Sequence, residues 1–167
     1  SLDLLVAQQS RWLHGVSGKR GGLLYQVGTK YSGDIDAFAS SIDIVGDVTG
    51  DGIADWIVGA NEQTGRGGFD EGYVWLCNGK NGDRSKELFS SRDEGADACA
   101  LGDVDGNGIP DVVLHLLPED TLYTPNSNPV VRVVSTKDGH TVWEKDTRTL
   151  RNALESAPVN PAPEKPR

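Results

Sequence analysis

The chain has 167 residues, 37% hydrophobic and 25% charged, which suits one soluble globular domain. A net charge of −9 at pH 7 argues against binding to nucleic-acid phosphates, which requires clustered Lys and Arg. No apolar run approaches the roughly 18 residues of a membrane helix, so we predict no membrane insertion. The chain contains no Met, and we interpret it as a processed or trimmed product from which a signal peptide could have been removed.

Three versions of one turn follow the N-terminal segment. Residues 1–10 are apolar early and polar late, leaving open a strand or a short helix, and we expect them to cover an exposed edge. The turns start at Ser17, Asn78 and Ser135, and each has Gly four residues later, which suits the positive φ of a hairpin turn. A phosphate-binding glycine loop would require a helix after the turn, whereas a strand pattern follows each of these.

Short apolar runs around these turns predict two repeats of four antiparallel strands, within a repetitive segment that spans 11–146. We expect strands at about 41–46, 56–60, 73–77 and 86–90 in the first repeat, and at about 98–102, 112–117, 130–135 and 141–145 in the second. Four strands in a period of roughly 40–60 residues are typical of a propeller blade. The second strand of each repeat is almost continuously apolar, which indicates a sheet covered on both faces.

The C-terminal part of the chain departs from this repeat. Residues 147–156 have Leu150 and Leu154 four apart and predict a short amphipathic helix. Four prolines among small and charged residues in 157–167 predict a linker or a disordered tail.

One nine-residue pattern occurs twice, each time between the first and second predicted strand of a repeat. D-V-T-G-D-G-I-A-D begins at Asp47, and D-V-D-G-N-G-I-P-D begins at Asp103. Both carry oxygen-bearing side chains at positions 1, 3, 5 and 9 around a Gly at position 6, an arrangement that surrounds a hard cation such as calcium. We predict two calcium ions per chain, each held by four side chains and by the carbonyl of an Ile: Asp47, Thr49, Asp51, Ile53 and Asp55 in the first loop, and Asp103, Asp105, Asn107, Ile109 and Asp111 in the second.

Two other interpretations of these loops are weaker. An EF-hand needs a bidentate Glu at position 12, where this chain has Val58 and Leu114. A plain Asp-Gly hairpin turn with solvated acids explains one copy as well as calcium does. Two matching copies in the same context favour calcium.

The paired loops and their flanks resemble the FG-GAP repeat of integrin α-subunit β-propellers and their bacterial relatives. Phe38-Ala39 lies where that family has Phe-Gly, and Gly59-Ala60-Asn61 lies where it has Gly-Ala-Pro. The second copy matches well only in its calcium loop. The resemblance covers roughly 11–146 and implies an all-β fold of propeller blades with structural calcium. It also implies a ligand-binding face opposite the calcium loops, which here includes Asp34, Asp36, Arg66, Phe69, Asp93 and Tyr123.

The chain is too short for a closed propeller. The two loops start 103 − 47 = 56 residues apart, so even four blades need about 220 residues. We therefore predict about two and a half blades. The chain is then a fragment of a longer propeller, one part of a ring completed by several copies, or a small stack with capped faces.

No catalytic constellation is evident in the sequence, and we predict that the protein is not an enzyme. The three histidines fall in separate predicted elements, without a spacing typical of zinc, and no G-x-S-x-G elbow is present. Acidic pairs on loops indicate solvated carboxylates rather than a glycosidase pair. All four tryptophans lie inside strand patterns, which favours core packing over a sugar-stacking platform: Trp12, Trp56, Trp75 and Trp143.

The cysteines and the calcium loops bear on the location of the protein. Cys77 and Cys99 lie in different repeats, and two buried free thiols are favoured over a disulfide. Such calcium loops suit the millimolar calcium outside the cytosol, so we expect an extracellular or cell-surface location, with the periplasm as another possibility. The expected function is a binding or adhesion module with a protein or glycan ligand. The alternative is a carbohydrate-binding accessory module of a secreted polysaccharide-active enzyme.

Overall fold

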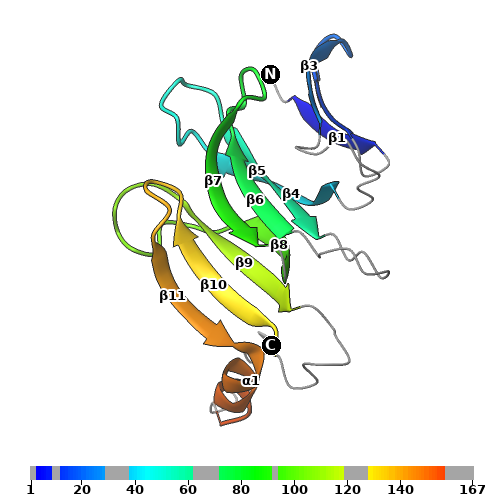
Figure 1. The fold of residues 1–167 in the computed structure, drawn as a ribbon. Helices are drawn as coiled ribbons and strands as arrows, with labels where there is room; N and C mark the ends of the chain where they lie inside the picture. The colour runs from blue at the N-terminus through cyan, green and yellow to red at the C-terminus, as the bar shows by residue number, and fades with distance from the viewer. Residues whose placement is uncertain are drawn as a thin grey trace, which may run out of the picture.

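The computed structural model describes residues 3–8, 12–28, 38–61, 72–91, 94–118 and 128–156. Within these ranges the chain forms eleven strands in three antiparallel sheets, followed by one helix. Figure 1 shows the three sheets following one another in chain order as successive layers. The described part of the chain does not close into a ring, which confirms the predicted all-β partial propeller.

The first sheet has three strands, in the order β1-β2-β3. They are β1 (Leu4–Gln8), β2 (Trp12–Val16) and β3 (Leu23–Gly28). Of the N-terminal segment, residues 4–8 therefore form a strand and not a helix, and β1 pairs along the whole of β2.

The second and third sheets each have four strands joined in sequence order, as a propeller blade requires. The second sheet comprises β4 (Phe38–Gly46), β5 (Asp55–Asn61), β6 (Gly72–Cys77) and β7 (Arg84–Ser91). The third comprises β8 (Glu94–Ala100), β9 (Asp111–Pro118), β10 (Val130–Ser135) and β11 (Thr141–Asp146). The predicted repeat of four strands is confirmed for both.

Strand β8 begins earlier than its sequence predicts. We expected a strand at about 98–102, whereas the structure places it at 94–100. Its sequence, E-G-A-D-A-C-A, has no β-branched residue, so local propensity does not predict it. Tertiary contacts define it instead, because the backbone N–H of Ala98 donates to Ser41 Oγ at 2.8 Å and that of Ala100 donates to Asp43 Oδ2 at 2.9 Å.

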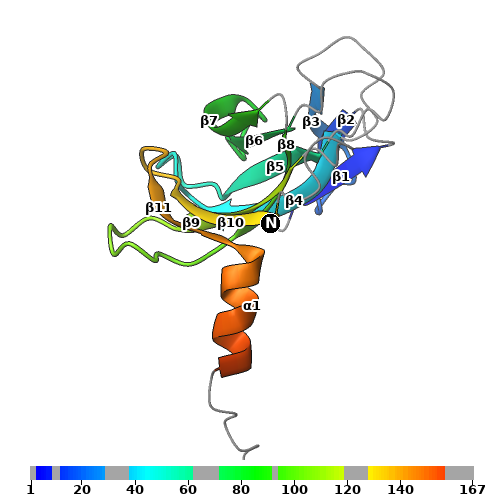
Figure 2. The same cartoon turned by 60° about the horizontal axis from the view of Figure 1, so that its bottom comes forward.

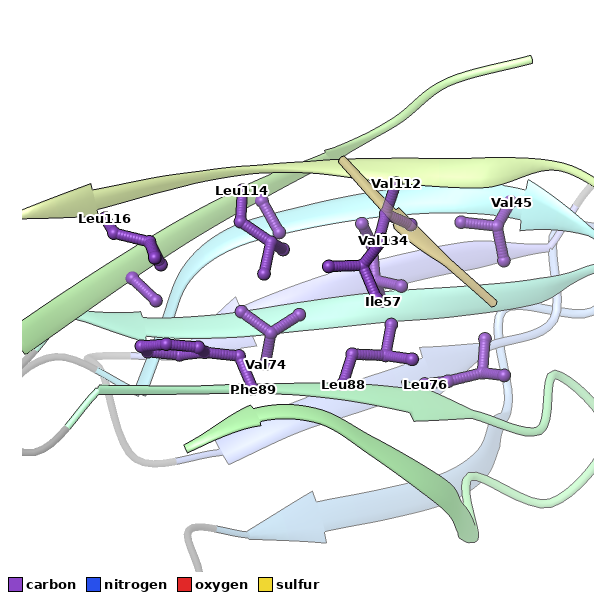
Figure 3. Packing of buried hydrophobic residues seen from close by; sticks show 12 residues of the cluster. Val45, Ile57, Val74, Leu76, Leu88, Phe89, Val112, Leu114, Leu116 and Val134 are labelled. Atoms are coloured by element: carbon purple, nitrogen blue, oxygen red, sulfur yellow. The ribbon is translucent and has the colours of Figure 1, made fainter. Parts of the chain in front are cut away.

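The larger hydrophobic core lies between the second and third sheets. In Figure 3 its aliphatic side chains and one phenyl ring face each other across the gap between the sheets. Burying each such side chain contributes about 1.5–3 kcal/mol to folding. The buried members are Val45, Ile57, Val74, Leu76, Leu88, Phe89, Ala96, Ala98, Val112, Leu114, Leu116 and Val134.

Two glycines allow the second and third sheets to approach closely. A β-carbon on Gly72 would lie 2.0 Å from the carbonyl oxygen of Glu94, and one on Gly95 would lie 1.9 Å from Oδ1 of Asn61. A larger residue at Gly72 would push the backbones of the two sheets apart, whereas one at Gly95 would first displace the Asn61 side chain.

A second core joins the first sheet to the second. Leu13 and Val27 from the first sheet belong to one buried cluster with Trp56, Val58 and Tyr73 of the second. Strands β5 and β6 are consequently buried along almost their whole length, as their continuous apolar sequences predict.

The outer faces of the first and last sheets are partly apolar and exposed. Trp56 and Trp75 are buried as predicted, whereas Trp12 and Trp143 are 45% and 37% exposed, so the prediction that all four tryptophans pack in the core is wrong. Trp12 lies on the first sheet and Trp143 on the third, and each of these sheets has its buried side turned toward the central sheet.

The two cysteine thiols are free, as predicted, but their environments differ. Cys77 is buried, and its burial raises the pKa of the thiol to about 12. Cys99 is exposed, so the expectation that both thiols are buried is wrong for this residue.

Helix α1 (Thr147–Ser156) follows β11 at the bounds predicted from the sequence. Figure 2 shows it projecting away from the sheets. Its N-terminus is capped by Asp146, which accepts hydrogen bonds from the backbone N and Oγ1 of Thr149 at 2.8 and 2.7 Å. Among the described residues, no helix has the length and apolar character needed to cross a membrane.

Candidate metal centre

The two predicted calcium loops occupy equivalent places in the second and third sheets. The first connects β4 to β5 and the second connects β8 to β9. Each loop bends at the glycines in positions 4 and 6, which have φ between 76° and 87° in both copies. Such positive φ values cost little for Gly and turn the backbone N–H groups toward the inside of the loop.

Position 1 organises each loop through its carboxylate. Asp47 accepts hydrogen bonds from the N–H groups of Gly50, Asp51 and Gly52 at 2.7, 3.0 and 2.8 Å. Asp103 accepts three from the matching residues of its loop at 2.8, 3.0 and 2.8 Å. The two loops are therefore the same at this position.

Position 9 is fully buried in both loops, at Asp55 and Asp111. In each case Oδ2 accepts the N–H groups of positions 2 and 3, at 2.8 and 2.7 Å in the first loop and at 2.7 and 3.3 Å in the second. The last acid of the motif thus ties the start of its loop to the strand that follows.

The other oxygen of position 9 distinguishes the loops. Oδ1 of Asp55 accepts the N–H of Gly79 at 3.0 Å and the hydroxyl of Thr49 at 3.2 Å. Oδ1 of Asp111 is buried and has no hydrogen-bond partner among the residues that the structure describes. A buried carboxylate oxygen without a partner is costly, because its desolvation is not compensated.

The turn after the third strand explains this difference. In the first repeat Gly79 comes so close to the loop that a β-carbon would lie 1.9 Å from the carbonyl oxygen of Ala54. The equivalent residue of the second repeat is Thr136, whose β-carbon is incompatible with that approach. Thr136 instead donates its hydroxyl hydrogen bond to the carbonyl of Pro110, the counterpart of Ala54.

The side-chain oxygens at positions 3 and 5 of the first loop also accept hydrogen bonds from another part of the chain. The Nδ2 group of Asn78 donates to Asp51 Oδ2 at 2.8 Å and to Thr49 Oγ1 at 3.1 Å. The hydrogen bond from Asn78 lowers the pKa of Asp51. A cation in this loop would have to compete with Asn78 for both oxygens.

Positions 3 and 5 of the second loop bond to each other. Asn107 accepts the N–H of Ile109 through Oδ1 at 2.9 Å and donates from Nδ2 to Asp105 Oδ2 at 2.7 Å and to Ser135 Oγ at 3.0 Å. Desolvation raises the pKa of Asp105, but the hydrogen bonds from Asn107 and Ser135 outweigh it, and the pKa is lowered.

A histidine that the sequence did not place at the site lies beside the second loop. His140 Nε2 is 3.7 Å from Asp105 Oδ2, and His140 Nδ1 is 2.6 Å from Asp138 Oδ1. The hydrogen bond to Asp138 raises the pKa of His140. The repeated turn could have located this residue from the sequence. His140 directly follows the turn that begins at Ser135, and Asp83 directly follows the equivalent turn that begins at Asn78, beside the first loop.

This arrangement can hold a divalent cation at the second loop. One carboxylate oxygen from each of Asp103, Asp105 and Asp111 lies within 4.8 Å of the others. Two calcium ligands at about 2.4 Å from one ion are at most about 4.8 Å apart, so the cluster has the dimensions of a calcium site. Asp111 of this cluster also has a buried Oδ1 without a hydrogen-bond partner among the described residues.

The sequence comparison agrees with this local geometry. Residues 47–114 match the family model of the FG-GAP-like repeat. The matched segment runs from the first residue of the first loop into β9 and includes the whole second loop, which confirms the resemblance inferred from the motifs. No curated protein matches the chain significantly.

The Phe-Gly position of the FG-GAP pattern has a structural explanation in this chain. Ala39 stands where the family has Gly, and its φ is 61°, a conformation that favours glycine. Phe38, the preceding residue, is buried in the core between the first two sheets. The residues expected on the ligand-binding face of the FG-GAP fold lie outside the described residues: Asp34, Asp36, Arg66, Phe69, Asp93 and Tyr123.

Proposed function

We propose that this protein is a calcium-stabilised binding or adhesion module of FG-GAP type, located outside the cytosol and without catalytic activity. The observation that carries the proposal is the buried, unpartnered Oδ1 of Asp111 beside the carboxylates of Asp103 and Asp105. Three acids gathered around one point are stable together when a cation offsets their charge.

Calcium would act here as a structural ion. The loop that it fills joins β8 to β9, and the buried Asp111 ties this loop to the strand that follows. When the free ion is present at 100 times its Kd, each site that binds only the folded chain raises the free energy of unfolding by about 2.7 kcal/mol. Two occupied loops would also offset part of the net charge of −9.

A protein or glycan ligand is the proposed partner. Rigid blades with long connections between strands are typical scaffolds for binding loops. The exposed apolar faces of the first and last sheets, at Trp12 and Trp143, further support association with additional blades of a larger propeller or with copies of this chain.

The decisive experiment is a calorimetric titration of chelator-treated protein with calcium, combined with thermal melting. We expect two sites and a higher melting temperature with calcium. Asp51→Ala should remove the first site and leave the second, and Asp103→Ala should do the reverse. Glu144→Gln, which removes an exposed acid of an ion pair on the third sheet, serves as the matched control. A melting temperature that calcium does not change would contradict the proposal.

A further inference from the structure

We propose that the outer edge of β1 is the binding site for one further strand, of the kind that begins the second and third sheets. The occupant is an extended segment with alternating apolar residues that leads into an acidic glycine loop, as β4 and β8 do. The inference goes beyond the proposed function and does not require calcium in either loop.

The first sheet corresponds to the last three strands of the other two sheets. The turn that begins at Ser17 joins β2 to β3, just as the turns that begin at Asn78 and Ser135 join β6 to β7 and β10 to β11. Strands β2 and β3 are therefore the third and fourth strands of a blade. Because β1 pairs antiparallel with β2, it takes the place of the second strand. The place that β4 and β8 fill in the other sheets lies along the opposite edge of β1.

The register of the pairing supports this equivalence. In each sheet, the residue that directly follows an aspartate lies opposite the residue that directly precedes the turn. The three pairs are Leu4 with Val16, Trp56 with Cys77, and Val112 with Val134. A shift of one residue would move every side chain to the other face of its sheet, so the same register in three sheets indicates equivalent strands.

Asp3 occupies the position of the last acid of a loop. Its Oδ1 accepts the N–H of Gly18 at 3.1 Å, and Oδ1 of Asp55 accepts the N–H of Gly79 at 3.0 Å. Gly18 and Gly79 are each the second residue of their turn, so the two contacts are equivalent. Asp55 is fully buried, whereas Asp3 is exposed. The first sheet thus presents the receiving half of a strand-and-loop unit.

Strand β1 has none of the features that protect exposed strand edges. Charged residues, prolines and bulges commonly prevent another segment from pairing with an edge strand. β1 reads L-L-V-A-Q, without a charge or a proline, and its pairing with β2 runs without a register shift. Leu4 and Val6 are 52% and 46% exposed, whereas their equivalents Trp56 and Val58 are buried. An edge of this kind can bind an extended segment through backbone hydrogen bonds.

The other two sheets show which side chains the occupant needs. In the second sheet, Ile44 and Ile42 of β4 lie opposite the residues equivalent to Leu4 and Val6. In the third sheet, two alanines of β8 hold these places. Side-chain pairs across neighbouring strands contribute to the stability of a sheet. The occupant is therefore a strand with apolar side chains at these two alternate positions.

The test adds a synthetic peptide to the intact, isotope-labelled chain and measures amide hydrogen exchange by NMR. The peptide has the sequence of residues 38–54, which comprises β4 and the loop up to the residue before Asp55. We expect exchange of the N–H groups on the outer edge of β1 to slow about tenfold at saturating peptide, and the amides of edge strand β11 to be unaffected. The same peptide with Ile42→Lys and Ile44→Lys is the control and should leave exchange at β1 unchanged.

Variants of the intact chain test where the peptide binds. Val6→Lys places a charge opposite Ile42 of the peptide and should weaken peptide binding about tenfold. Thr141→Lys, the matched control, places the same charge on edge strand β11 and should bind the peptide like the parent. Both replaced side chains are exposed, so both variants should fold.

Three results would overturn the inference. The first is exchange at β1 that the peptide does not slow, and the second is slowing that Val6→Lys leaves intact. The third is protection of β1 in the chain alone that rises with protein concentration, because a second copy would then cover the edge. Calcium titration of the same samples measures the two loops separately, so failure of peptide binding would leave the proposed function standing.

Discussion

The two loops have the same nine-residue pattern but use its oxygens differently. In both, the first acid gathers three backbone N–H groups and the last acid bonds the start of the loop. In the first loop, Asn78 and Gly79 from a neighbouring turn also engage the acids. In the second, Ser135 and Thr136 hold the same places and leave Asp111 with an unpartnered oxygen. The motif alone therefore does not fix how much each loop needs a cation; the turn beside it does.

This contrast implies two kinds of stability. The first loop is supported by protein hydrogen bonds whether or not an ion is present. The second concentrates three carboxylates with one uncompensated buried oxygen, so we expect its stability to depend on an ion. Changes that alter one oxygen or one turn at a time can test the difference.

The largest effect is expected from replacing the last acid of each loop by its amide. Asp55→Asn should destabilise the protein by about 3 kcal/mol with or without calcium, because its oxygens accept four protein hydrogen bonds and the new amide cannot accept them all. Asp111→Asn in chelator should leave stability unchanged or raise it, because it removes a buried charge that has no partner at Oδ1.

Urea unfolding of both variants in chelator and in calcium measures this difference. Calcium should no longer stabilise the second loop of Asp111→Asn. Equal destabilisation by the two substitutions in chelator would show that the loops have the same hydrogen-bonding state, contrary to the structure.

A smaller effect is expected from changing the turn that contacts the first loop. Gly79→Ala places a β-carbon against the carbonyl of Ala54, so we expect a loss of about 2 kcal/mol from overpacking. Thr136→Ala, the matched change in the second repeat, removes one hydrogen bond to Pro110 and should cost about 1 kcal/mol. Thermal melting of both variants in chelator gives the order, and a larger loss for Thr136→Ala would contradict the close approach at Gly79.

Much of the fold could be predicted from the sequence because its signals are local and repeated. Alternating turns and apolar runs located the strands of both complete sheets, and the spacing of Leu150 and Leu154 gave helix α1. The predicted bounds of strand β8 were wrong because small residues form this strand and its position depends on contacts with β4. The exposure of Trp12 and Trp143 depends on which sheets are outermost, a property that no single strand encodes.

The candidate site was predictable as a motif and not as an arrangement of donors. The repeated loop identified the acids, but the unpartnered oxygen of Asp111 arises from the difference between Gly79 and Thr136 in a distant turn. His140 was missed for a similar reason, because its place beside Asp105 depends on the pairing of β10 with β9 and β11. Contacts between segments far apart in sequence decide both features.

The smallest effect is expected far from both loops, at the start of helix α1. Hydrogen bonds from Thr149 lower the pKa of Asp146, which is the helix cap. Because the folded pKa is below the unfolded value of about 3.9, this stabilisation is present above that pH and is lost as the pH falls through the folded pKa. The helical circular-dichroism signal of the parent should therefore decrease slightly on acidification. Asp146→Ala should have the weaker signal already at neutral pH, while its calcium titration remains that of the parent. Altered metal binding in this variant would show that the helix and the loops are coupled, and the contrast between the two loops would then need a contribution from outside their turns.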